Sequence, residues 1–127
     1  MTTFLYRKST NGNYFPIIDL TLHYKKNLLK TSALIDSGAA VSIFREEVAD
    51  ELRIKIEAGE EIYLNGVGGR IKGYVHRLKL EVAGKTFSCP IVFSREYLVS
   101  FNLLGRAAFF PKFKITFEEK NQQVALN

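Results

Sequence analysis

Hydrophobic and polar residues alternate along several short segments of the chain, which is the period of a half-buried β-strand. In the clearest segment, IIDLTLHY (17–24), Ile18, Leu20 and Leu22 share one face, and His23 lies on the polar face as a solvated strand residue. The polar KKN that follows predicts a turn, and LLKTSALID (28–36) leads back as a second strand. The pattern therefore predicts an antiparallel pair of strands that ends at an acidic residue.

Two hairpins are predicted in the middle of the chain. EIYLNGVGGRIKGYV (61–75) consists of two strand segments joined by a glycine-rich tip. HRLKLEVAGKTFSCPIVF (76–93) alternates before an Ala-Gly-Lys turn at 83–85, and we interpret His76 as a structural residue of this strand. Alternation returns at 113–117, and the tail 120–127 predicts one more strand, so the fold class is all-β.

The period changes to that of a helix between Ser42 and Ile54. Apolar residues fall four positions apart there, with acidic residues between them, which predicts a short amphipathic helix with Ser42 as its N-cap. A second short helical turn is expected after Gly105, ended by Pro111. The chain is therefore expected to contain one or two short helices.

The composition is that of one ordinary globular domain. The chain has 127 residues, of which 46% are hydrophobic and 24% charged. Residues 1–13 end in the turn-rich STNGN, so we expect an N-terminal arm that is mobile or adds a strand, followed by a single domain over 14–127. The net charge of +5 is spread along the chain, which indicates solvated faces rather than one basic patch.

Several kinds of site and location are excluded by the residue content. Cys89 is the one cysteine, so the chain has no internal disulfide and no multi-cysteine metal site, and its apolar neighbours predict a small buried side chain. No apolar stretch is long enough for a signal peptide or a membrane span. We therefore expect a cytoplasmic location and no membrane partner.

An acidic residue interrupts the apolar run LIDSGAAVSIF (34–44). Burying an unpaired carboxylate is costly, so Asp36 needs an explanation. A bare Asp-Ser-Gly is usually a turn. Here, however, the apolar Leu34 in front would bring the acid to the end of a buried strand, and Gly38 and Ala39 behind it leave room for another backbone. Asp36 is therefore a candidate catalytic residue.

The plan of this segment occurs twice in the chain. ALIDSGAAVSIF (33–44) and NLLGRAAFF (102–110) both have an apolar strand, a glycine, small residues and an aromatic residue. The acid is present in the first copy alone. The spacing of Gly38 and Gly105 fits two related halves of one domain.

Three features in order resemble the retropepsin-like aspartic proteases. LIDSGAA (34–40), NGVGGRIKG (65–73) and NLLGRAAFF (102–110) match that family's active-site loop, flap and second-half glycine motif, and the resemblance extends over about 15–119. It implies a closed retropepsin-like barrel with a flap hairpin. Ala40 stands where retroviral members usually place an acid, which points to a cellular or prokaryotic type.

The resemblance implies that the chain is half an enzyme. Two identical chains would form a homodimer in which each supplies one Asp36. Two carboxylates about 3 Å apart cannot both ionise comfortably, so they share one proton and activate a water molecule that attacks a peptide carbonyl. The implied activity is that of an aspartic endopeptidase acting on polypeptides, with no cofactor and no metal.

The resemblance also assigns roles to the residues around Asp36. Ser37 would tie the two active-site loops of the dimer together, Gly38 would offer its carbonyl to the substrate, and Ala39 would support the loop. The remaining implied positions are the flap tip Gly66, Val67, Gly68 and Gly69, the pocket residues Leu34, Ile43, Phe101 and Leu103, with Val67 beside them, and the second-half motif Gly105 and Arg106.

Two other readings of the sequence stay open. The chain could be a catalytically silent, protease-like binding or scaffold module, since the acid that would pair with Arg106 is missing. A small basic β-barrel could instead bind nucleic acid through stacking aromatics. Because the aromatic residues fall mainly on apolar faces or in apolar runs, we expect no nucleic-acid partner.

Overall fold

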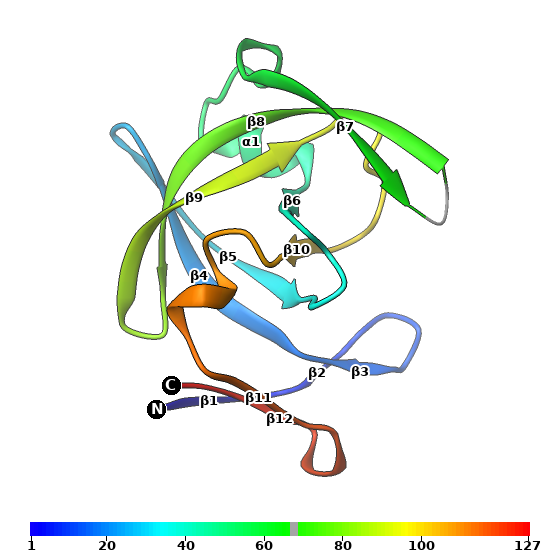
Figure 1. Cartoon of the computed structure of the whole chain (residues 1–127), viewed down its shortest axis with the longest axis vertical. Coiled ribbons are helices and arrows are strands. Elements are labelled where there is room, and N and C mark those ends of the chain that lie inside the picture. The colour runs from blue at the N-terminus through cyan, green and yellow to red at the C-terminus, as the bar shows by residue number, and fades with distance from the viewer. Residues whose placement is uncertain (67–68) are drawn as a thin grey trace.

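Most of the chain forms β-strands arranged in three sheets (Figure 1). The structure is a computed structural model, and it describes residues 1–66 and 69–127. The strands are β1 (Thr2–Leu5), β2 (Arg7–Lys8), β3 (Tyr14–Phe15), β4 (Ile17–Tyr24), β5 (Asn27–Ile35), β6 (Ser42–Phe44), β7 (Glu60–Gly66), β8 (Gly69–Val82), β9 (Lys85–Phe93), β10 (Asn102–Leu104), β11 (Ile115–Glu118) and β12 (Gln123–Leu126). The helical segments are α1 (Glu46–Glu51) and the 3-10 turns η1 (Ile56–Ala58), η2 (Phe110–Lys112) and η3 (Glu119–Asn121).

The main sheet has seven strands in the order β4-β5-β10-β6-β9-β8-β7. Strand β8 also pairs with β4, through Lys79–Glu81 and Thr21–His23, so the series of strands returns to its start. One hydrophobic core fills the interior of this arrangement. Its largest fully buried side chains are Phe44, Phe93, Phe109, Ile18, Leu22, Leu52, Ile56, Leu80, Ile91, Leu104, Leu126 and Val92.

The alternating segments predicted as strands are strands. In β4, Ile18, Leu20 and Leu22 are buried, whereas Asp19 is exposed. The predicted turn follows, with Lys25 at a φ of 53°. Alternation identified this pair correctly because successive side chains of a strand point to opposite faces.

Both predicted hairpins are present in the described residues. Strands β7 and β8 are antiparallel and their register runs to the pair Gly66 and Gly69. Val67 and Gly68, which belong to the predicted flap tip, lie outside the described residues. The turn between β8 and β9 has Ala83 and Gly84 at φ values of 49° and 81°, the left-handed pair that favours a two-residue hairpin.

The two histidines have the roles expected of structural residues. His23 lies on the polar face of β4, where its Nε2 is 3.1 Å from Oε2 of Glu81. His76 is buried in β8, and its Nε2 is 2.8 Å from the carbonyl oxygen of Ile56. Each ring therefore joins two elements of the fold.

Two predictions about helix ends are wrong. Ser42 does not cap a helix: it lies in β6, whose strand runs on to Phe44, and α1 begins four residues later with Arg45 as its N-cap. Residues 42–44 form a strand instead of the start of the helix because β6 pairs with both β10 and β9. Pro111 does not end its helical turn but lies inside η2, in the first turn of a helix, where its missing N–H costs nothing.

The two ends of the chain meet in a three-stranded sheet. Strand β12 lies in the middle and pairs antiparallel with β1 on one side and β11 on the other. Figure 1 shows the N- and C-termini next to each other at the end of this sheet. Over the described residues, no helix has the length and apolar character needed to cross a membrane.

Candidate active site

Asp36 directly follows β5 and begins a tight turn. Its backbone N–H donates to the carbonyl oxygen of Leu104 at 3.0 Å. Its side-chain Oδ1 accepts the N–H of Gly38 at 2.8 Å, and its carbonyl oxygen accepts the N–H of Ala39 at 3.2 Å. The carboxylate is half-buried and its orientation is fixed by the turn that the Asp-Ser-Gly sequence forms.

The segments that share a plan in the sequence lie side by side in the structure. Strand β10 is inserted between β5 and β6, parallel to β5 and antiparallel to β6. Beyond the strands, the N–H of Arg106 donates to the carbonyl of Ala39 at 2.8 Å, and the N–H of Ala107 donates to Ala40 at 3.0 Å. The loop that carries Asp36 is therefore joined to the second glycine motif within one chain.

Gly105 lies at the closest point between these two loops. A Cβ atom at this position would be 2.3 Å from the carbonyl oxygen of Val41 and 2.8 Å from that of Ala39. The buried Ser42 supports the same contact, since its Oγ accepts the N–H of Gly105 at 3.0 Å. Glycine is required at 105 because backbone atoms occupy the space of any side chain.

Three of the predicted pocket residues form a row across neighbouring strands. Leu103 in β10 lies opposite Leu34 in β5 and opposite Ile43 in β6. Directly opposed residues share a face of the sheet, and all three side chains are half-buried. Phe101 lies just before this strand, with its ring 6.3 Å from that of Phe15. Phe15, which ends β3 shortly before β4 begins at Ile17, was not among the residues predicted from the sequence.

Five other predicted residues are exposed in the single chain, whereas Ala39 is half-buried. Ser37 and Gly38 lie at the surface of the turn, and the side chain of Arg106 is exposed. In the β7–β8 hairpin, Gly66 and Gly69 are exposed, and the guanidinium of Arg70 lies 4.0 Å from the ring centre of Tyr63. This cation–π contact places the charge of Arg70 against its own hairpin.

Tyr97 is a second residue near the carboxylate that the sequence did not indicate. It is buried, and its hydroxyl donates to the carbonyl of Phe101 at 2.8 Å. Burial raises the pKa of Tyr97 to about 12, and the negative charge of Asp36 contributes to the increase. Tyr97 therefore remains a hydrogen-bond donor that holds the backbone at Phe101. No alternation marks the segment SREYLVS (94–100) around it.

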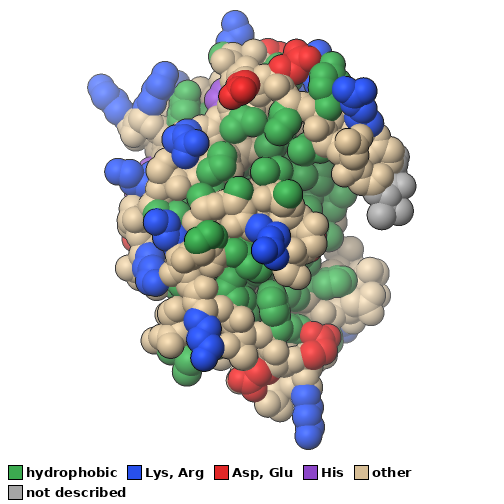
Figure 2. Space-filling view, viewed as in Figure 1, with side chains coloured by type: hydrophobic (Ala, Val, Ile, Leu, Met, Phe, Trp, Pro, Cys, Tyr) green, Lys and Arg blue, Asp and Glu red, His purple; other side chains and the backbone are tan. Residues whose placement is uncertain are grey.

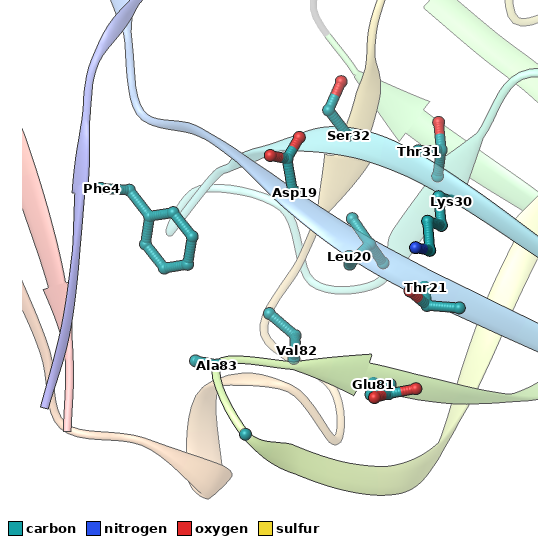
Figure 3. Close-up of a pocket in the computed structure, with 11 residues that line it drawn as sticks. Phe4, Asp19, Leu20, Thr21, Lys30, Thr31, Ser32, Glu81, Val82 and Ala83 are labelled. Atoms are coloured by element: carbon teal, nitrogen blue, oxygen red, sulfur yellow. The ribbon is translucent and has the colours of Figure 1, made fainter.

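A prominent hollow of the surface lies away from Asp36. It is a groove of about 640 Å³ between β1, β4, β5 and the β8–β9 turn, lined by residues such as Phe4, Asp19 and Lys30 (Figure 3). None of the predicted site residues that the structure describes lines it. A second hollow of about 350 Å³ includes Phe101 and Ile17 in its wall.

The distribution of side chains over the surface is uneven. In Figure 2, hydrophobic side chains gather across the middle of the face that is shown, and most Lys and Arg side chains stand around its edge. Among the side chains of residues 1–66 and 69–127, no group of three or more His, Cys, Asp or Glu is arranged to hold a metal ion.

In this all-β chain, the Asp-Ser-Gly turn is joined by backbone hydrogen bonds to a second, glycine-containing loop. Residues 24–108 match the family model described as aspartyl protease. The chain therefore belongs to the aspartyl protease family, and it is an aspartic-type endopeptidase, as the sequence predicted. Among curated proteins, none matches its sequence.

Solved structures confirm the retropepsin-like fold. A retropepsin-like aspartic protease from Rickettsia conorii is 17% identical, with a TM-score of 0.67 over 98% of this chain and 98% of that chain. The EIAV protease in complex with the inhibitor HBY-793 is 18% identical, with a TM-score of 0.59 over 77% of this chain and 88% of that chain. The predicted all-β, retropepsin-like fold class is confirmed.

Proposed function

We propose that this aspartic endopeptidase is active as a homodimer whose two Asp36 side chains form the catalytic dyad. The observation that carries the proposal is that one chain presents one half-buried carboxylate in a preformed turn. An aspartic protease needs two carboxylates that share a proton. A two-fold axis beside the turn would supply the second carboxylate from an identical chain.

In the proposed mechanism, the ionised carboxylate of the pair takes a proton from a water molecule held between the two chains. The oxygen of that water attacks the carbonyl carbon of the scissile peptide bond, and the protonated carboxyl donates to the carbonyl oxygen as negative charge develops there. The N–H of Gly38, 2.8 Å from Oδ1 of Asp36, keeps the carboxylate in one orientation throughout. The carboxyl that took the proton from water then gives it to the leaving nitrogen, and the C–N bond of the tetrahedral intermediate breaks.

We further propose that the β7–β8 hairpin is the flap that covers an extended polypeptide substrate. Its strands pair up to Gly66 and Gly69, and Gly69 has a φ of +111°, which allows the backbone at the end of the hairpin to take conformations that other residues avoid. The row formed by Leu34, Leu103 and Ile43 would contact apolar side chains of the substrate.

The silent scaffold remains the second candidate, because Arg106 is exposed instead of pairing with an acid after Ala39. The preserved turn around Asp36 favours catalysis over a scaffold. The backbone hydrogen bonds from Arg106 and Ala107 connect the second glycine motif to the Asp36 loop without an ion pair.

The test compares the wild type with Asp36→Asn in cleavage of a peptide library at mildly acidic pH. We expect Asp36→Asn to lose at least about 1,000-fold in kcat/KM, since the dyad loses its base and its shared proton. Asp50→Asn, which changes an exposed carboxylate on α1, is the matched control and should cleave like the wild type. Equal cleavage by the Asp36→Asn variant would refute the proposal.

Analytical ultracentrifugation of the same samples tests the dimer. Activity per chain should rise with protein concentration in step with the dimer fraction. The scaffold would be supported instead if the folded wild type captures peptides but cleaves none of them, and if Asp36→Asn captures the same peptides equally well.

A further inference from the structure

The β7–β8 hairpin separates from the rest of the sheet at one point. The antiparallel register of β8 and β9 ends at the pair Tyr74 and Phe93. Beyond that pair, the segment 69–73 of β8 pairs with β7 alone. Figure 1 shows the two strands of the hairpin extending past the end of β9. A hinge for this hairpin is therefore expected close to Tyr74.

After β9 ends, side chains of the following segment, instead of its backbone, bind the backbone of β8. Ser94 is fully buried, and its hydroxyl donates to the carbonyl oxygen of Lys72 at 2.5 Å. The Oε1 atom of Glu96 accepts the N–H of the same Lys72 at 3.4 Å, and the N–H of Glu96 donates back to Oγ of Ser94 at 3.1 Å. Both backbone groups of Lys72 are thus bound by Ser94 and Glu96.

The adjacent glycine permits this close contact. A Cβ atom on Gly73 would lie 2.6 Å from Cγ1 of Val92 and 3.2 Å from the carbonyl oxygen of Phe93. The missing side chain lets β8 lie against the end of β9 at the position where Ser94 reaches Lys72. Across the hairpin, Nζ of Lys72 is 3.7 Å from Oε2 of Glu61 in β7, so the contact point involves both strands.

The segment that holds Lys72 is itself fixed to the body of the protein. Arg95 donates to both carboxylate oxygens of Glu57 at 3.0 and 3.2 Å and to Glu46 at 3.1 Å, which attaches it to η1 and α1. The hydrogen bond with Arg95 lowers the pKa of Glu57, so this carboxylate stays ionised to a lower pH than an ordinary glutamate. Ser94 therefore connects the hairpin to a segment that is itself hydrogen-bonded to η1 and α1.

We propose that Ser94 is a positioning residue that sets the hinge of the hairpin at Lys72, so that the part beyond Lys72 opens and closes as the flap. The inference rests on the proposed function of the hairpin as a flap. Without the Ser94 hydroxyl, the carbonyl of Lys72 is released and the hinge moves back to Tyr74. A longer moving hairpin spends less time closed over the substrate, which weakens substrate binding more than it slows the chemical step.

The experiment measures hydrogen exchange of the hairpin in Ser94→Ala and in Glu96→Ala. The second variant changes an exposed side chain, so it tests the contact without disturbing the core. Loss of one hydrogen bond at the hinge should speed exchange over 60–66 and 69–72 about fivefold, with β4 and β5 unchanged. Ser88→Ala, which changes an exposed serine of β9, is the matched control and should exchange like the wild type.

Kinetics provide the second measurement. We expect KM to rise about fivefold in Ser94→Ala while kcat stays within about twofold. Unchanged exchange of the hairpin in both variants, or faster exchange spread evenly over β4 and β5, would overturn the inference. Because exchange is measured without turnover, a wild type that cleaves no peptide refutes the proposed function and leaves the exchange result to decide the hinge.

Discussion

The substitution Gly105→Ala should destabilise the protein strongly, because the added Cβ atom would meet backbone. The nearest atoms are the carbonyl oxygen and carbon of Val41, at 2.3 and 2.4 Å, and the carbonyl oxygen of Ala39, at 2.8 Å. A backbone carbonyl cannot rotate away as the end of a flexible side chain can. The loop after β10 must therefore move away from the loop that carries Asp36.

The decrease in the free energy of unfolding can be worked out from the contacts that this movement breaks. Three hydrogen bonds cross between the loops: Gly105 to Ser42, Arg106 to Ala39 and Ala107 to Ala40. At about 1 kcal/mol each they sum to about 3 kcal/mol, and overpacking adds about 1–3 kcal/mol. Stiffening of the unfolded chain by alanine returns about 1 kcal/mol. The free energy of unfolding should fall by about 3–5 kcal/mol.

Thermal unfolding by calorimetry, at one fixed protein concentration, measures the effect. For a domain of this size the loss corresponds to a fall in Tm of about 10–20 °C. Gly66→Ala is the matched control, since no atom of residues 1–66 and 69–127 outside its chain neighbours lies within 4 Å of a Cβ at that position, and its Tm should stay within about 3 °C of the wild type. A Tm for Gly105→Ala as close to the wild type as that of the control would refute the close-approach argument.

Two further predictions concern titratable groups. Burial raises the pKa of the Cys89 thiol to about 11, so labelling by a disulfide reagent at pH 8 should be at least about 100-fold slower in the native protein than in guanidinium-unfolded protein, and equal rates would contradict this. The pKa of Glu57 is lowered in the folded state, first by its hydrogen bond with Arg95, so its contribution to stability is present above the pKa of the unfolded state and is lost as the pH falls through the lower folded value. Glu57→Gln should therefore show a smaller loss of Tm between pH 6 and pH 3 than the wild type, and an identical pH profile would contradict the assignment.

The strands of the fold could be predicted from the sequence because their signal is local. Ile18, Leu20 and Leu22 alternate with polar residues, and the Ala83-Gly84 turn has residues that suit left-handed backbone. The repeated plan around Gly38 and Gly105 also indicated two related segments. Each of these features, including each copy of the repeated plan, is read from residues within a few positions of each other.

The contacts that complete the site depend on pairing between distant segments. Ser42 has the residue type and position of an N-cap, but pairing of β6 with β9 and β10 keeps it in a strand, where it binds Gly105 instead. Tyr97 and Ser94 lie in a segment with no periodic pattern, and their partners are set by where that segment leaves β9. Sequence patterns report which face of an element is buried, and they do not report which distant backbone group a side chain will meet.

The contacts around Asp36 also bear on what association must supply in the proposed dimer. Within one chain, Asp36 is bound to Leu104 and Gly38, and the following loop is bound to Arg106 and Ala107. The loop therefore needs no ordering when two chains meet, and the entropy of fixing it is lost during folding. Ordering of flexible segments is one of the main costs of association, so a preordered loop leaves more of the interface energy for holding the dimer together. In this design the partner contributes its own carboxylate to a turn that is already in position, which is the arrangement expected of an active site built on rigid elements.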